Sequence, residues 1–458
     1  MTCQVIRVGV FFDGTGNNLS NDEAGRSKNG VSNIGKLYRL YRDGERFEGQ
    51  KITECEVTVK AIYIEGVGTK NGEDDYSTGG AFGALGGQRI RRAITQVKAI
   101  FAKYPAREYQ QQIDVFGFSR GAAMARDFIN SLANEEVKLK YQIKFVGIFD
   151  TVGSFGYPGN DQNWKPKTDK YTETDLLIED KFGMKAPEKY FEPYNFNLSP
   201  KSAEQIVHFV AMDEYRKNFP LTDTNGVGLT YEFIGAHSDV GGGYAKIEKE
   251  KIAVMGLNKS EAELTAPNKY GIQIGENWTC YSLDDLVDDE LPYCNGTRTI
   301  TDDLQKVALV AMHRLALRAG VPFKESIKSL YPDIPEYDPA EMASLNWTQE
   351  LQDYFAVAVE NISELRDFLN EGEKLNNGAK GELRTDRNIP HLKILAKYGH
   401  NSSGIFKGDI YRPAPLGFYP RIYNFTAEDI AKSPINRVKD VPKRNVFHNN
   451  VKQAIVKA

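Results

Sequence analysis

The sequence predicts an α/β fold, with a mostly parallel central sheet and helices on both of its faces. Short apolar runs alternate with helical patterns through the first half of the chain, as expected of successive βαβ units. At residues 112–121 one such run passes into the letters GFSRG and then directly into another helical pattern. The alternation and this abrupt turn from strand to helix together predict the fold class.

Each element of the sheet has a signal of its own. One segment, about residues 88–104, places Ile90, Ile94, Val97 and Phe101 on a single face, which is typical of a helix that packs on a sheet. The other predicted helices are residues 34–42, the segment after the GFSRG turn, and 304–320, which is stopped by Gly320 and Pro322. Apolar runs predict strands at residues 4–12, 57–64, 112–117, 143–149, 205–212 and 229–236.

Two segments interrupt this alternation. Residues 154–204 and 245–300 are polar excursions, and the aromatic side chains in them suit either a cap over the sheet or ordinary packing. We divide the chain into a catalytic part, residues 1–320, and a C-terminal extension, 321–458, that is helical and then irregular.

The end of the chain is basic. Between Lys432 and Lys457 there are seven Lys or Arg residues and one acid, Asp440. Such a segment suits anionic lipid or an acidic partner, but we favour a solvated tail.

Composition and charge argue against several classes of protein. The 458 residues are 41% hydrophobic and 26% charged, which is typical of a soluble globular protein, and the net charge of −4 gives no reason to expect nucleic-acid binding. The apolar start of the chain reads as a strand and not as a signal peptide. No apolar run is long enough to span a bilayer, so contact with a membrane would be made from the surface.

The four cysteines show no spacing typical of a metal site. Cys280 and Cys294 are close enough in sequence to pair in an oxidising compartment, although we favour unpaired thiols. We interpret Cys3 and Cys55 as small apolar residues. The acidic run at 284–290 matches no calcium loop and is interpreted as a solvated face, so no metal and no cofactor is expected.

The GFSRG turn matches the pattern G-x-S-x-G, which carries the nucleophile in the α/β-hydrolase fold. Small residues must flank Ser119 there, because the turn is strained and the strand and helix backbones pass closely. A serine hydroxyl also needs a histidine to take its proton. Among the six histidines we choose His237, because it directly follows a predicted strand, at the edge where open α/β sheets gather their catalytic groups.

The acid that would orient His237 has three candidates. Asp150 ends the first strand after the nucleophile and Asp213 ends the second, which is the commoner position in this fold. Asp239 lies very close to His237 in sequence and is better suited to holding its loop. The residues alone leave the choice between Asp150 and Asp213 open.

Backbone amides are expected to form the oxyanion hole. One is the N–H of Arg120, directly after the nucleophile, and the second should come from the loop at residues 11–18, from Gly14 or Thr15. In that loop Asp13 or Asn17 would hold the backbone in place by hydrogen bonds.

Four segments taken together resemble a known family: FFDGTGNN, GFSRGAAMAR, GIFDTVGSFG and GAHSDVGGGY. They are similar to the catalytic domain of the first family of type VI secretion lipase effectors, within a wider α/β-hydrolase family with GFSRGA and HSDVGGG motifs, over about residues 4–320. The resemblance implies a triad of Ser119, Asp150 and His237, and phospholipase A activity at a phospholipid membrane surface. It also implies synthesis in the bacterial cytoplasm, delivery by a secretion-spike protein into the periplasm of target cells, and a cognate immunity protein.

Two other functions suit the same residues. The G-x-S-x-G turn does not select a substrate, so a soluble carboxylesterase or thioesterase remains an alternative. A non-catalytic binding or adaptor protein on the same fold is the second alternative, although such a protein would have no need of both Ser119 and His237.

Overall fold

The computed structural model describes most of the first half of the chain and shorter parts of the second. The described residues are 3–27, 29–44, 46–48, 55–72, 86–134, 140–155, 194–214, 216, 219–255, 279–281, 293–336, 342, 344–345, 347–358, 382–384, 394, 397–400, 421–423 and 444–455. The predicted acidic run at 284–290, most of the excursion at 154–204 and much of 321–458 lie outside them.

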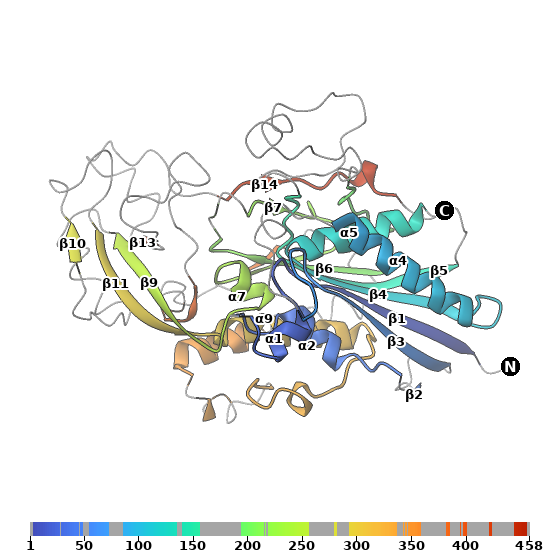
Figure 1. The fold of residues 1–458 in the computed structure, drawn as a ribbon, viewed down its shortest axis with the longest axis horizontal. Helices are drawn as coiled ribbons and strands as arrows, with labels where there is room; N and C mark the ends of the chain where they lie inside the picture. The colour runs from blue at the N-terminus through green and yellow to red at the C-terminus, as the bar shows by residue number, and fades with distance from the viewer. Residues whose placement is uncertain are drawn as a thin grey trace.

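An eight-stranded sheet forms the centre of the molecule, in the order β12-β8-β6-β5-β4-β1-β3-β2 (Figure 1). Every neighbouring pair is parallel except β2 and β3. Its strands are β1 (Gln4–Phe12), β2 (Arg46–Glu48), β3 (Glu56–Ile64), β4 (Gln110–Phe118), β5 (Tyr141–Phe149), β6 (Gln205–Ala211), β8 (Leu229–Phe233) and β12 (Glu382–Arg384). The predicted α/β class with a mostly parallel sheet is confirmed.

Helices cover both faces of this sheet (Figure 1). On one face lie α4 (Gly86–Lys103) and α5 (Arg120–Ala133), and on the other α2 (Asn33–Leu40) and α9 (Asp303–Arg318). Side chains of β1 alternate between two hydrophobic clusters, because successive residues of a strand point to opposite faces. Thus Val10 and Phe12 pack with α4 and α5, whereas Phe11 packs with α2 and α9.

Two short helices lie near the carboxyl ends of the strands, α1 (Leu19–Glu23) and α7 (His237–Gly241). Short 3₁₀ turns follow later in the chain, at Ile327–Ser329 and Val451–Gln453. Within the described ranges no helix is both long and apolar enough to cross a bilayer.

The polar excursion at 245–300 contains strands that its sequence did not predict. The strands β9 (Ile247–Met255), β10 (Thr279–Tyr281) and β11 (Tyr293–Thr301) form a second sheet, in the order β10-β11-β9-β13. Its fourth strand, β13 (Arg421–Tyr423), comes from the C-terminal extension. Figure 1 shows this sheet projecting to one side of the central sheet.

The described part of the basic segment is not a solvated tail. Residues 444–455 lie against the catalytic part, where β14 (Val446–Phe447) pairs with β7 (Leu221–Thr222). The side chain of Asn449 is buried and makes hydrogen bonds to both the N–H and the C=O of Leu198. The preference for a solvated tail was wrong here, because neutral polar residues beside the basic ones satisfy buried backbone groups. The boundary at residue 320 stays a prediction.

Cys3 and Cys55 form a disulfide, which corrects their interpretation as separate apolar residues. The parallel register pairs Gln4 of β1 with Glu56 of β3, so the residues just before these two strands lie side by side. This neighbourhood depends on strand pairing, which the spacing of the cysteines does not reveal. In the second sheet Cys280 lies opposite Cys294 in the register of β10 and β11.

Candidate active site

Ser119 lies at the tight turn between β4 and α5, as its motif predicts. Its backbone has φ 58° and ψ −127°, a conformation that a residue with a side chain adopts only under strain of about 1–3 kcal/mol. The neighbouring strand holds it there: the Ser119 N–H donates to the C=O of Phe149, and its C=O accepts from the N–H of Val152. Two hydrogen bonds, one to a residue before Asp150 and one to a residue after it, thus hold the turn in place.

Both glycines of the motif are required by close backbone approach. A Cβ at Gly117 would lie 2.7 Å from the Cα of Ala122. A Cβ at Gly121 would lie 2.3 Å from the carbonyl oxygens of Phe12 and Asp13, at the end of β1. The glycines therefore let the start of α5 press against the loop that follows β1, which brings the two parts of the predicted oxyanion hole together.

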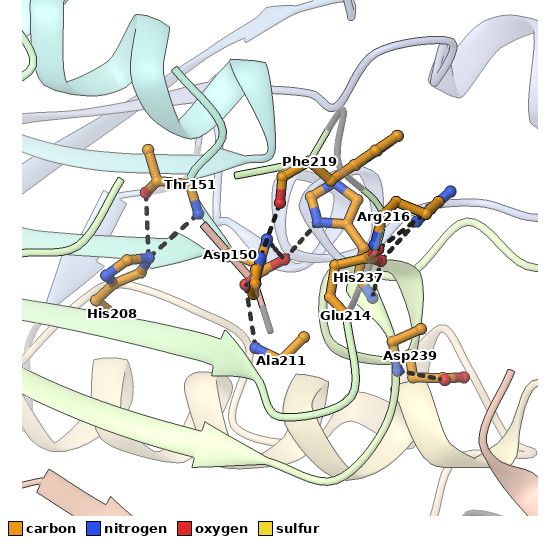
Figure 2. Close-up of polar contacts among 11 residues, drawn as sticks. Asp150, Thr151, His208, Ala211, Glu214, Arg216, Phe219, His237 and Asp239 are labelled. Carbon is orange, nitrogen blue, oxygen red and sulfur yellow. Dashed lines mark hydrogen bonds and ion pairs between the residues drawn. The ribbon is translucent and has the colours of Figure 1, made fainter. Parts of the chain in front are cut away.

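His237 begins α7, at the carboxyl edge of the sheet, and its ring is turned toward Asp150 (Figure 2). Its Nδ1 lies 2.5 Å from Oδ2 of Asp150, and both side chains are buried. The ring packs against Phe118, the residue before Ser119, with 4.6 Å between ring centroids, and against Phe219 at 5.0 Å. This packing places the imidazole beside the nucleophile turn.

The second ring nitrogen of His237 is available for chemistry. Its Nε2 is buried and has no hydrogen-bond partner within the described part of the chain. Because Nδ1 faces a carboxylate, the favoured tautomer carries its hydrogen on Nδ1 and leaves Nε2 as an acceptor. Burial lowers the pKa of His237 below its usual value, against the opposing effect of Asp150. The histidine is therefore held in its neutral, proton-accepting form.

Asp150 is the acid that the structure brings to His237. Its carboxylate accepts four hydrogen bonds: from His237 Nδ1, from the backbone N–H of Ala211, and from two nitrogens of Arg444, at 2.6 and 2.7 Å. Burial alone would raise the pKa of Asp150, but the Arg444 guanidinium and His237 hold it well below its usual range. The acid is therefore an anion whose four acceptor positions are all occupied.

Arg444 and Glu214 are contacts that motif reasoning missed. Glu214 is fully buried, accepts from the backbone N–H of His237 at 3.2 Å, and is itself paired with Arg216 (Figure 2). It lies directly after Asp213, so a search of the strand end would have found it. No local signal identifies Arg444, which is 294 residues from Asp150 in sequence and belongs to the basic segment.

The other two candidate acids lie elsewhere. Asp213 accepts from the N–H of Gly235 at 2.8 Å, which ties the ends of β6 and β8 together. Asp239 accepts from the N–H of Ala236 and from Nδ1 of His400, so it holds the start of α7, as expected of a loop-holding residue.

The histidine in β6 contacts the backbone next to Asp150. His208 is fully buried, and its Nε2 accepts from the backbone N–H of Thr151 at 3.2 Å. Burial lowers its pKa to about 3, so it stays neutral. It contacts Thr151, the residue that follows Asp150 (Figure 2).

The loop after β1 is held by the buried carboxylate of Asp13, one of the two residues expected to do so. Ser32 donates to one of its oxygens at 2.6 Å and Tyr63 to the other at 2.5 Å, and burial raises the pKa of Asp13 to about 6. The N–H of Gly14 donates to Asp13 Oδ1 at 2.7 Å, which corrects its choice as an oxyanion donor, because that amide is already engaged.

Thr15 is the remaining candidate for the donor from this loop. Neither its backbone N–H nor its buried Oγ1 has a hydrogen-bond partner among the described residues. Arg120 is buried at the first position of α5, next to Ser119. In the described ranges no group of three or more His, Cys, Asp or Glu side chains is placed to hold a metal ion.

Comparison with solved structures gives a fold relative of nearly the same length. The structure described as the Tle1 effector bound to the VgrG spike from the Type 6 secretion system aligns with 97% of this chain and 94% of its own, at 20% identity and a TM-score of 0.54. An uncharacterized protein from Pseudomonas aeruginosa aligns with 78% of this chain and 51% of its own, at 18% identity and a TM-score of 0.39, which is too low to carry an argument. Among curated proteins no match is found.

Comparison with protein families is more specific. The chain matches the family described as "T6SS, Phospholipase effector Tle1-like, catalytic domain" over residues 7–135 and 127–261, which together make up more than half of its length. The matched residues include the nucleophile turn, the strand end at Asp150 and the whole of α7. The chain belongs to the family of Tle1-like phospholipase effectors of the type VI secretion system.

Proposed function

We propose that this protein is a serine hydrolase that cleaves a carboxylic ester bond of glycerophospholipids, a phospholipase A, with Ser119, His237 and Asp150 as its triad. The observation that carries the proposal is the buried Asp150–His237 hydrogen bond, because the opposite nitrogen of His237 is left as an acceptor beside the strained turn of Ser119.

The reaction would proceed in two acyl-transfer steps. Ser119 Oγ attacks the ester carbonyl while Nε2 of His237 takes its proton, and the resulting oxyanion accepts hydrogen bonds from the N–H groups of Arg120 and Thr15. His237 then protonates the leaving lysolipid alkoxide, and water hydrolyses the acyl-enzyme by the same route. Asp150 orients the imidazole and stabilises its cationic form.

A substitution at the nucleophile tests this proposal. Vesicles of phosphatidylethanolamine and phosphatidylglycerol, with different acyl chains at sn-1 and sn-2, are incubated with wild type, Ser119→Ala and Ser131→Ala. Ser131 is a matched control, because it lies on the same helix and donates to Asp127, away from the turn. Mass spectrometry of the released fatty acids should show release by wild type and the control but not by Ser119→Ala, and the released chain identifies the bond cleaved.

The same assay separates the alternatives. Hydrolysis of small esters or thioesters, without release of fatty acid from vesicles, would indicate a soluble esterase or thioesterase and contradict the phospholipase. Turnover of neither substrate by a folded wild type would indicate a binding or adaptor protein. Undiminished release by Ser119→Ala would remove the serine from the mechanism.

A secretion-spike partner and a periplasmic destination belong to this proposal. The spike partner is supported by family membership and by the fold relative, whose structure is described as bound to the VgrG spike. A cognate immunity protein is expected in the producing cell if the hydrolase attacks lipids common to producer and target. Co-purification tests the spike protein as a partner. The immunity protein is tested by whether its co-expression rescues cells that express this chain in the periplasm.

A further inference from the structure

We propose that Arg444 is a positioning residue for the Asp150–His237 pair, and that it is brought there by the fold of residues 444–455, here called the C-terminal clamp. The inference rests on the proposed function, since it concerns the histidine that would activate Ser119. It begins from the bidentate contact between the Arg444 guanidinium and both oxygens of Asp150, at 2.6 and 2.7 Å.

The geometry restricts Asp150 to one orientation. Each oxygen of the carboxylate meets one nitrogen of Arg444, and the remaining positions go to Ala211 N–H and to His237. A planar guanidinium that binds both oxygens fixes the plane of a carboxylate, which a single hydrogen bond does not. Asp150 also has φ 39°, so its backbone is itself strained and needs such support.

Arg444 is fixed by a backbone contact of its own and by the anchoring of the segment that follows it. Its Nε donates to the C=O of Phe219 at 2.8 Å, and β14 pairs with β7 directly after it. Further along, Asn449 bonds Leu198, and the N–H of Asn450 donates to Asn197 Oδ1 at 2.7 Å. The guanidinium is thus placed by a folded segment and not by a free side chain.

The charges around His237 define what Arg444 does. Asp150 follows β5, Glu214 and Arg216 follow β6, and Arg444 comes from the clamp, while Phe118 and Phe219 are the aromatic neighbours. The two acids and two arginines balance one another, so protonated His237 is the only uncompensated charge among these groups. Arg444 therefore opposes protonation of His237 while it keeps Asp150 ionised and oriented.

The experiment compares Arg444→Gln, Arg444→Lys and the matched control Lys452→Gln. Lys452 is an exposed residue of the same clamp, so its variant changes the net charge equally without reaching Asp150. Each protein is first checked by thermal unfolding. The rate of labelling by a fluorophosphonate, which forms a bond from Ser119 Oγ to phosphorus as fluoride leaves, is then measured against pH, together with kcat and KM on an ester.

Arg444→Gln should lower kcat by about 10- to 100-fold, a part of what general acid–base catalysis contributes, with little change in KM. The acid limb of kcat/KM should move up by about one pH unit, because a positive charge near His237 is removed. Arg444→Lys keeps the charge but loses the planar contact of two nitrogens with the two oxygens of Asp150. It should therefore keep the wild-type acid limb and lose part of kcat. Lys452→Gln should behave as wild type.

A second comparison separates positioning from general damage. In an Asp150→Asn background, Arg444→Gln should have less than about a twofold effect on kcat, because the contact it removes is already gone. Equal effects in both backgrounds, or wild-type kcat and acid limb in a folded Arg444→Gln, would overturn the inference. If Arg444→Gln does not fold, an Arg444→Lys variant with full kcat overturns it.

The labelling step keeps this inference apart from the proposed function. Arg444-dependent labelling of Ser119 without release of fatty acid from vesicles would support the clamp and contradict the phospholipase. A folded wild type that is not labelled at Ser119 would overturn both.

Discussion

Two buried Asp–His pairs each include a residue of α7, and they differ in what surrounds the histidine. In the first, Asp150 meets His237 Nδ1 at 2.5 Å, and in the second, Asp239 meets His400 Nδ1 at 2.8 Å. All four residues are at most 4% exposed, so burial does not distinguish the pairs.

The far side of each ring does distinguish them. His400 stacks on Tyr244, with 3.4 Å between ring centroids, and its Nε2 faces Glu248 at 3.5 Å. Nε2 of His237 lies beside the nucleophile turn without a partner among the described residues. An Asp–His contact alone is thus no sign of catalysis; what matters is the atom that the remaining nitrogen can reach.

The largest expected effect is at His237. His237→Ala should lower kcat by at least about 10⁴-fold, because it removes the proposed general base. His400→Ala should keep kcat within a few-fold. Steady-state kinetics on a soluble ester measures both, and a similar loss in the two variants would show that the pairs do not differ in role.

Replacing the acids is expected to have the next largest effect. Asp150→Asn should reduce kcat by about 10³- to 10⁴-fold, since the amide no longer selects the tautomer of His237. Asp213→Asn should leave most of the activity, because that carboxylate holds a backbone N–H between strands. The reverse result would make Asp213 the catalytic acid.

The second pair should affect stability more than rate. Asp239→Asn should lower the free energy of unfolding by about 1–3 kcal/mol, because it weakens buried hydrogen bonds to His400 and to the start of α7. Denaturant unfolding measures this change, with kcat/KM as the control. Loss of activity without loss of stability would contradict the structural role.

The smallest expected effect is on the pH dependence of the wild type. A base titrates out as pH falls, so kcat/KM should decline through the pKa of His237. Because burial lowers that pKa, the half-maximal point should lie below about 6.5, the value of an unperturbed histidine. A midpoint above 6.5 would mean that Asp150 outweighs burial.

The parts of the site that follow from local sequence were predictable. The five-residue motif identifies Ser119, because the turn requires both of its glycines. His237 is identified by its place directly after a predicted strand. The choice of Asp150 came from family resemblance, because two strands end in an aspartate. The engaged amide of Gly14 was missed, since a preceding carboxylate can accept from it only in this loop geometry.

The parts that depend on long-range pairing were not predictable. Arg444 reaches Asp150 only because the clamp folds back beside β7. The strands of residues 245–300 pair with each other across a polar segment, so no hydrophobic pattern marks them. In both cases partners far apart in sequence supply the stabilising contacts.

The Cys3–Cys55 bond makes the stability of this chain depend on redox conditions. It joins the starts of β1 and β3. Each of these strands has nine residues, so the bond lies about 30 Å from the edge of the sheet where the candidate site is found. It closes a loop with a sequence separation of 52. Cross-linking a loop of this length raises the free energy of unfolding by about 4 kcal/mol. A reducing cytoplasm would remove that contribution and an oxidising periplasm would restore it. Unfolding with and without dithiothreitol measures the difference, and kcat of the folded protein should stay the same.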